Sequence, residues 1–279
     1  MLHLSGAPAS RSVPPVLEVA PIPAFADNYI WLLRRSGSRA AVVVDPGDAG
    51  PVLRHLAAHS LDLAGVLLTH HHPDHIGGVA ELVRDRAVPV YAPHDPRIPV
   101  ATVRVAEGER IRLEDIDADF EVLEIPGHTS SHIAYFGEGM LFCGDTLFAM
   151  GCGRVFDGTM QELKRSLDRL AALPPATQAY CGHEYTLANA AFAHEFEPDN
   201  PALRERVESC RRLRRDGKAT LPARLSDERA TNPFLRLDDA TLRDRIAGRT
   251  SADRDDADSC FAALRALKDG FRPPAGWME

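Results

Sequence analysis

Short apolar runs alternate with amphipathic stretches over the first two thirds of the chain. The run at residues 63–68 holds almost no polar position, which is typical of a buried strand. Residues 49–59 and 159–173 instead repeat apolar side chains at helical spacing, and Thr159 with Glu162 forms a capping box. The pattern therefore predicts an α/β arrangement. We predict strands at residues 16–21, 29–34, 40–44, 63–68, 88–91, 120–125, from 133, 140–143 and 178–181, and helices at 49–59, 78–86 and 159–173.

The pattern changes after residue 185, where strand-like runs vanish. Four helical stretches follow, at residues 186–196, 200–216, 238–246 and 255–268. We therefore expect a loose leader at residues 1–16, an α/β domain at 17–185 and a smaller helical domain at 186–279. Within the first domain, residues 103–113 predict a hairpin around Glu107 and Gly108.

Potential metal ligands follow four of the predicted strands. One cluster comes directly after residues 63–68, and three single residues each follow a glycine at the end of a later strand. Open α/β sheets build their sites at the carboxyl ends of strands, and glycine lets the chain turn sharply there. The candidates are His70, His72, Asp74, His75, His128, Asp145 and His183.

Seven donors exceed the four that a tetrahedral zinc ion takes. They suit two ions if one carboxylate bridges, and imidazole with carboxylate suits zinc, iron or manganese. Two such ions lie about 3.5–4 Å apart and can clamp a hydroxide between them. The sequence therefore predicts a hydrolase with two divalent ions.

The spacing His70-x-His72-x-Asp74-His75, followed by an isolated His, Asp and His, resembles the metallo-β-lactamase superfamily. The segments 144–148, 151–153 and 181–186 are similar to glyoxalase II, the hydroxyacylglutathione hydrolases, as are Asp27-Asn-Tyr29 and Arg265-x-x-Lys268. This resemblance extends over residues 17–279. It implies an αβ/βα sandwich, with two mixed sheets inside and helices outside, and a smaller C-terminal helical domain.

The resemblance also implies roles for the ligands. One metal would be held by His70, His72 and His128, the other by Asp74, His75 and His183, with Asp145 as the bridge. A hydroxide between the metals would attack a thioester carbonyl, with Asp74 orienting it and no serine or cysteine nucleophile. Asp45, at a strand end, is the candidate for orienting a ligand imidazole, and a plain turn-capping role is the alternative.

The substrate implied by the resemblance is S-(2-hydroxyacyl)glutathione, cleaved to glutathione and a 2-hydroxy acid. For S-D-lactoylglutathione the acid is D-lactate, and the reaction is the second step of methylglyoxal detoxification. Arg265 and Lys268 share a helix face and would grip the glycine carboxylate. The substrate-binding positions are Arg154, Phe156, His183, Tyr185, Arg265 and Lys268.

Two of these positions depart from the family pattern. Members often carry lysine at the position of Arg154, so charge is kept while the hydrogen-bond geometry changes. Members often carry tyrosine at the position of Phe156, so a hydroxyl contact is lost and we expect weaker affinity for glutathione.

Other functions within the fold remain open at this point. A glutathione persulfide dioxygenase would use a single iron, which the complete second ligand set and the helical C-terminal region disfavour. A lactonase, β-lactamase or nuclease is disfavoured by residues 181–185 and by Arg265 with Lys268. A metal-binding protein without activity would not need the proposed substrate positions.

Composition narrows the setting. The net charge of −8 disfavours nucleic-acid binding, and the basic run at residues 211–215 predicts a solvated helix face. Five cysteines without a Cys-x-x-Cys pair predict reduced thiols in the cytoplasm. No apolar run approaches the roughly 18 residues of a membrane span, and residues 1–16 lack the features of a secretory signal. We expect a cytoplasmic monomer that acts on a glutathione thioester and holds two divalent ions, with zinc as the first choice.

Overall fold

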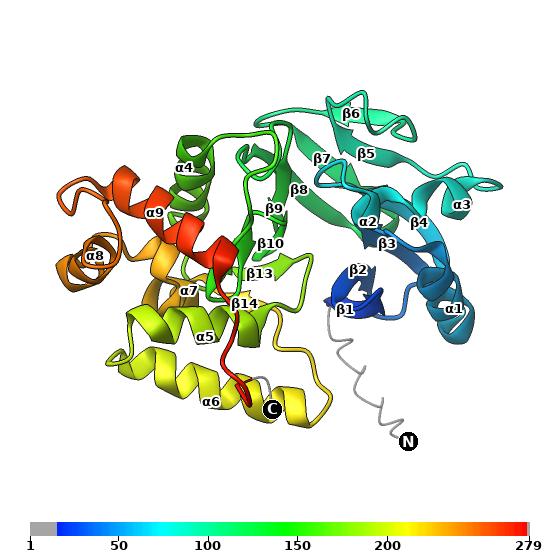
Figure 1. Ribbon diagram of the computed structural model, residues 1–279. Coiled ribbons are helices and arrows are strands. Elements are labelled where there is room, and N and C mark those ends of the chain that lie inside the picture. Colours follow the sequence, from blue (N-terminus) through cyan, green and yellow to red (C-terminus); the bar gives the residue numbers. More distant parts are fainter. Residues whose placement is uncertain (1–15, 278–279) are drawn as a thin grey trace, which may run out of the picture.

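Two six-stranded sheets make up the centre of the N-terminal part of the molecule (Figure 1). The computed structural model describes residues 16–277. The first sheet starts with antiparallel pairs and continues with parallel strands. Helices α1 and α3 make the crossover connections on its outer face for the first two parallel pairs, and an irregular segment at residues 94–102 makes the third. Its order is β1 (Leu17–Ala24), β2 (Asn28–Arg35), β3 (Ala40–Val44), β4 (Asp62–Leu67), β5 (Val90–Pro93) and β6 (Val103–Val105).

The second sheet is mostly antiparallel, with one parallel pair between β10 and β13. Its order is β14 (Ala223–Arg224), β13 (Gln178–Cys181), β10 (Met140–Gly144), β9 (Ile133–Gly137), β8 (Ala118–Glu124) and β7 (Arg110–Leu113). A separate two-stranded ribbon joins β11 (Leu147–Phe148) to β12 (Gly151–Cys152).

Apolar side chains of both sheets form one continuous core, in which Val42 and Leu67 of the first sheet join Phe120 and Phe142 of the second. A second cluster lies on the outer face of the first sheet, where Val52 packs with strand residues. Helices thus cover the outside of both sheets, and the sandwich that the resemblance implies is confirmed. The outer helices are α1 (Ala49–His59), α3 (Val79–Val83) and α4 (Met160–Ala171). The single turn α2 (Pro73–Ile76) lies in the loop after β4, and η1 (Glu114–Ile116) is a 3-10 turn.

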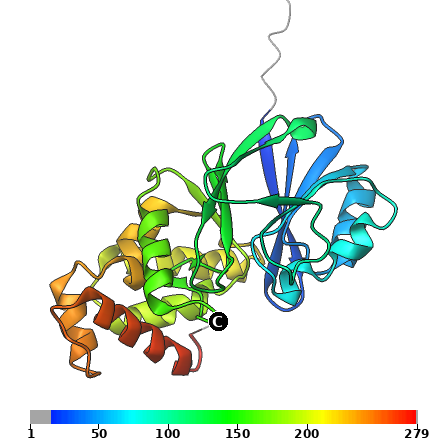
Figure 2. The same cartoon turned by 90° about the horizontal axis from the view of Figure 1, so that it is seen from above.

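Helices dominate the chain after β13, as the sequence predicts. Seen from above, they lie beside the second sheet, on the side away from the first (Figure 2). In the described part of the chain, no helix is both long and apolar enough to cross a bilayer. The elements are α5 (Thr186–Phe196), α6 (Pro201–Arg215), α7 (Leu225–Thr231), η2 (Pro233–Leu235), α8 (Ala240–Ala247) and α9 (Ala257–Gly270).

Two local predictions need correction. The predicted hairpin at residues 103–113 is wrong, because β6 pairs with β5 and β7 pairs with β8, in different sheets. The turn exists, but it carries the chain from one sheet to the other, and Val105 and Ile111 both enter the core between them. The helical region also contributes a strand, β14, whose two residues are too short to produce a periodic signal. The proposed leader at residues 1–16 lies outside the described residues except for its last position.

Candidate metal centre and substrate cavity

The seven predicted ligands meet where loops leave β4, β8, β10 and β13. Backbone geometry allows this close approach at two glycines. Gly144 has φ +47°, and a Cβ there would lie 2.3 Å from Oγ1 of Thr69. A Cβ on Gly182 would lie 2.6 Å from Oδ1 of Asp145. Side chains at these positions would push the ligand loops apart.

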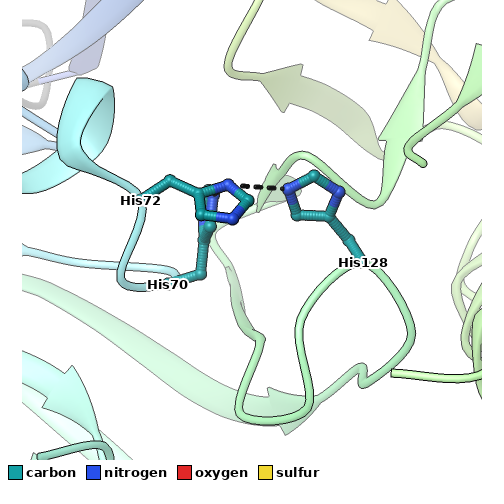
Figure 3. Close-up of side chains that lie close together, drawn as sticks. All are labelled: His70, His72 and His128. Carbon is teal, nitrogen blue, oxygen red and sulfur yellow. Dashed lines mark hydrogen bonds between the residues drawn. The ribbon is translucent and has the colours of Figure 1, made fainter. Parts of the chain in front are cut away.

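His70, His72 and His128 point toward one another from two facing loops (Figure 3). The Nδ1 atom of His72 lies 3.1 Å from Nε2 of His70 and 3.1 Å from Nε2 of His128. In His70 and His128, a hydrogen bond at Nδ1, on the side of the ring away from His72, fixes the tautomer. His128 Nδ1 donates to the carbonyl of Arg154 at 2.8 Å, and His70 Nδ1 lies 3.0 Å from the hydroxyl of Thr69.

Lone pairs therefore converge in this trio. The Thr69 hydroxyl donates its hydrogen to Asp45 at 2.7 Å, so it accepts from His70. With Nδ1 protonated in both His70 and His128, each Nε2 presents a lone pair to His72. One hydrogen on His72 can satisfy only one of them, whereas a metal cation can accept all three. The donor set thus fits a divalent ion.

Asp74, His75 and His183 form a second trio beside the first. Oδ2 of Asp74 lies 3.5 Å from Nε2 of His75 and 3.4 Å from Nε2 of His183. Asp145 reaches both trios, with Oδ1 3.4 Å from His75 and Oδ2 3.2 Å from His183 and 3.7 Å from His128. Nε2 of His75 and Oδ1 of Asp145 are buried without a hydrogen-bond partner among the described residues, which again fits a cation between them.

The two trios differ in electrostatic character. Burial lowers the pKa of His70 and His128, and burial together with His128 lowers the pKa of His72 to about 4. These imidazoles are neutral at pH 7, the form that binds metal. In the second trio, burial opposes charge, but Asp145 and Asp74 outweigh it and raise the pKa of His183 to about 10. The carboxylates of this trio therefore stabilise a positive charge between them, which a bound metal cation would supply.

Asp45 orients ligands of both trios through hydrogen bonds to His75 and Thr69. Its Oδ1 accepts the backbone N–H of Thr69 at 2.8 Å, and its Oδ2 accepts from His75 Nδ1 at 3.1 Å and from the Thr69 hydroxyl. Its backbone has φ +52°, an unfavourable conformation for a non-glycine residue. These contacts match the orienting role considered for Asp45 and leave its carboxylate unavailable for capping a turn. Asp45, His70 and His75 also lie close enough together to form a third cluster of potential ligands. The oxygens of Asp45 are already hydrogen-bonded to the protein, however.

The metal centre opens into a cavity of about 490 Å³ between the sandwich and the helical region. All six predicted substrate positions line it, together with His72, Asp74, His128 and Asp145. The Tyr185 ring stacks on His183 with centroids 4.7 Å apart. The Phe156 side chain is exposed, and its ring stands edge-on to His72 at 5.0 Å.

The cationic side chains of the cavity differ in how freely they can meet a ligand. Arg265 is buried, donates to the carbonyl of Cys152 at 2.7 Å and lies 3.1 Å from Asp269. Arg154 is exposed and lies 3.2 Å from the same Asp269 carboxylate. Lys268 donates to a backbone carbonyl at 3.3 Å, and burial together with nearby Arg265 lowers its pKa to about 8.

Sequence reasoning missed several residues that contact the ligands. Asp27 and Asn28 belong to a motif that the sequence singled out without a role, yet they hold His183 and Asp74. His132 is not among the predicted ligands. It is buried, but its Nδ1 donates to the carbonyl of Ile133 and its Nε2 accepts the backbone N–H of Asp145 at 3.2 Å. No spacing rule could have found these contacts. Further cavity residues outside the predicted set are Phe148, Cys152, Ala188, Asn189 and Phe271.

Comparison with known proteins agrees with this geometry. The family model of the metallo-beta-lactamase superfamily matches residues 25–183, and that of the hydroxyacylglutathione hydrolase C-terminus matches residues 184–271. A hydroxyacylglutathione hydrolase of Alkalilimnicola ehrlichii is 49% identical over 90% of this chain and 98% of its own length. One of Pseudomonas fluorescens is 46% identical over 92% of this chain and 100% of its own.

This chain belongs to the hydroxyacylglutathione hydrolase family. Like other members of that family it is an enzyme, a hydrolase, and its His and Asp cluster is the site of a divalent metal. Solved structures show the fold. ETHE1 from Myxococcus xanthus superposes with a TM-score of 0.61 at 23% identity, over 93% of this chain and 92% of its own. The BLEG-1 B3 metallo-beta-lactamase superposes with a TM-score of 0.59 at 22% identity, over 79% of this chain and 100% of its own.

Proposed function

We propose that this hydrolase cleaves the thioester of S-(2-hydroxyacyl)glutathione, with S-D-lactoylglutathione as the substrate of choice, to glutathione and a 2-hydroxy acid. The observation that carries the proposal is the placement of Asp145. Its Oδ2 lies between His128 of one ligand trio and His183 of the other, and its Oδ1 faces His75, in a cavity that cationic side chains also line.

The two trios suit two divalent ions, one on His70, His72 and His128 and one on Asp74, His75 and His183, with Asp145 shared. Zinc is the first choice for such donors, and iron and manganese use the same ones. When bound, the ions would supply Lewis-acid polarisation and a water of lowered pKa.

Side chains of the cavity orient the attacking water and cover the ligand His183. Asp74 lies on the cavity wall, half-exposed, and burial raises its pKa less than contact with His183 and His75 lowers it, so it is ionised at pH 7. It can therefore accept a hydrogen bond from the attacking water and orient it. The Tyr185 and Phe148 rings shield His183 on the cavity side. Water adds to the carbonyl carbon, the C–S bond breaks, and the thiolate leaves and takes up a proton.

Glutathione carries two carboxylates, and the cavity offers cations to meet them. Lys268 and Arg154 line the cavity and are less tied to the protein than Arg265, since Lys268 donates to one backbone carbonyl and Arg154 pairs with Asp269. Arg265 is held by backbone carbonyls, so we assign it the task of fixing the β12 segment beside the bound peptide as well as adding positive potential. Phe156 can offer an apolar face where a tyrosine would add a hydroxyl.

All seven ligands and the cavity come from one chain, which supports action as a monomer. The five cysteines are free and buried, which supports a reducing, cytoplasmic setting.

The test is hydrolysis of S-D-lactoylglutathione by the purified protein, with zinc, iron and manganese determined on the same sample. We expect turnover with close to two ions per chain. Two ions without turnover would reject the substrate and direct the search to lactones and other thioesters. One iron with oxygen consumption on glutathione persulfide would instead support a dioxygenase.

A further inference from the structure

The turn between β1 and β2 joins the two sheets next to the metal centre. The backbone N–H of Tyr29 donates to the carbonyl of Gly182 at 2.8 Å, and that of Glu184 donates to the carbonyl of Asp27 at 2.8 Å. Asn28 and His183 thus form an isolated antiparallel bridge between segments about 155 residues apart. The turn is therefore fixed in place by the backbone, and its side chains are free to act on their neighbours.

Asp27 fixes the ring of His183. Its Oδ1 accepts from Nδ1 of His183 at 2.8 Å, which keeps a hydrogen on Nδ1 and makes Nε2 the nitrogen that can exchange its hydrogen for a metal ion. This Nε2 faces Asp74 at 3.4 Å and Asp145 at 3.2 Å. Without Asp27 the imidazole could flip or exchange tautomers, and Nε2 would no longer be held in this direction.

Asn28 fixes the carboxylate of Asp74. Its Nδ2 donates to Oδ2 of Asp74 at 3.0 Å and lies 3.5 Å from the backbone carbonyl of the same residue. Because an ionised carboxylate and a carbonyl can only accept, the amide nitrogen must face them. Asn28 is 7% exposed, so water has little room to replace these donors.

Contacts of the other trio come from elsewhere in the chain. His70 is held by Thr69 and His128 by the carbonyl of Arg154, and neither bonds to the turn. We propose that Asp27 and Asn28 are positioning residues for one metal subsite only, that of Asp74, His75 and His183. This inference rests on the proposed use of two ions. It assigns a task to the Asp27-Asn-Tyr29 motif, which the reaction itself does not explain.

The experiment measures metal binding without substrate. Metal-free wild type, Asp27→Ala and Asn28→Ala are titrated with Zn²⁺ against a chromophoric chelator, and with Co²⁺ while the visible spectrum is followed. We expect wild type to bind two equivalents. In each variant one equivalent should weaken by roughly ten- to hundredfold while the other keeps its affinity. The Co²⁺ spectrum of the weakened equivalent alone should change.

Two further variants separate positioning from general damage. Asp27→Asn keeps an oxygen that can accept from His183 and should recover most of the lost affinity. Tyr29→Phe removes a hydroxyl that donates to Glu184 at 3.0 Å but contacts no ligand, so it should bind both equivalents like wild type. Thermal unfolding of the metal-free proteins checks that each variant folds, and Asn28→Ala carries the test if Asp27→Ala does not fold.

Equal weakening of both equivalents in a folded alanine variant, or no weakening of either, would overturn the inference. Failure of the proposed function is visible separately. A wild-type protein that binds a single ion would remove the premise, whereas two ions with no thioester turnover would leave the positioning role intact.

Discussion

The Oδ2 atom of Asp45 lies 3.1 Å from Nδ1 of His75 and also accepts the hydroxyl hydrogen of Thr69. Since that hydroxyl accepts in turn from His70, one carboxylate orients a ligand in each trio. Its effect should therefore differ from that of the β1–β2 turn, which touches one trio only.

Asp45→Asn should weaken both metal equivalents by roughly ten- to hundredfold, because an amide cannot accept at both of its polar atoms. Competition for Zn²⁺ with a chelator measures this. Asp48→Asn is a matched control, since Asp48 caps α1 through the N–H of Gly50 and contacts no ligand. Unchanged affinity in Asp45→Asn would show that these hydrogen bonds do not contribute to metal binding.

Phe156→Tyr should improve substrate binding. The Phe156 side chain is 63% exposed at the cavity, so an added hydroxyl meets no steric obstacle and can reach glutathione. One new hydrogen bond of about 1 kcal/mol would lower KM about fivefold and leave kcat unchanged. Phe25→Tyr is the control, because Phe25 is also exposed but does not line the cavity. A KM equal to that of wild type would show that the missing hydroxyl has no effect.

Local sequence carries much of the metal centre. Each ligand follows an apolar strand, so strand ends alone predict that His128 and Asp145 gather with the cluster at His70. The fold class could be predicted for the same reason, because buried strands alternate with amphipathic helices. These features depend on periods of two to four residues, which a sequence displays directly.

Contacts that depend on distant pairing could not be predicted. Asp27 meets His183 only because the β1–β2 turn crosses to the other sheet. The division of residues 103–113 between two sheets depends on the partners β5 and β8, not on the turn itself. Arg265 has the sequence signature of a free cation, yet its burial against Cys152 is decided by how α9 packs on the β12 segment.

Removal of metal should destabilise the protein strongly. Half-exposed Asp74 and buried Asp145, His75 and His183 bring two carboxylates and two imidazoles together, and bound cations offset the desolvation of the buried groups. An ion present at 1,000 times its Kd adds about 4 kcal/mol to the free energy of unfolding. Excess chelator should therefore lower the Tm of wild type by several degrees.

Asp145→Ala provides the comparison for this effect. It should lose metal and most activity, and chelator should then leave its Tm almost unchanged. His72→Ala should behave likewise, because it removes the donor on which two other imidazoles converge. Full turnover with normal metal content in either variant would defeat the ligand assignment.

Lys268 should make substrate affinity depend on pH. Burial and the neighbouring Arg265 lower its pKa to about 8, so the ammonium is present below that pH and is lost above it. Because a carboxylate binds the protonated form, KM should be constant between pH 6.5 and 7.5 and rise as pH passes through 8. Loss of a charged hydrogen bond of about 1.5–3 kcal/mol corresponds to a rise in KM of roughly tenfold or more.

Two variants of Lys268 test this assignment. In Lys268→Arg the guanidinium stays charged, so the rise should disappear, and in Lys268→Ala KM should be high at every pH. Steady-state kinetics from pH 6.5 to 9, corrected for spontaneous thioester hydrolysis, give the comparison. A rise of the same size in the arginine variant would assign the titration to another group.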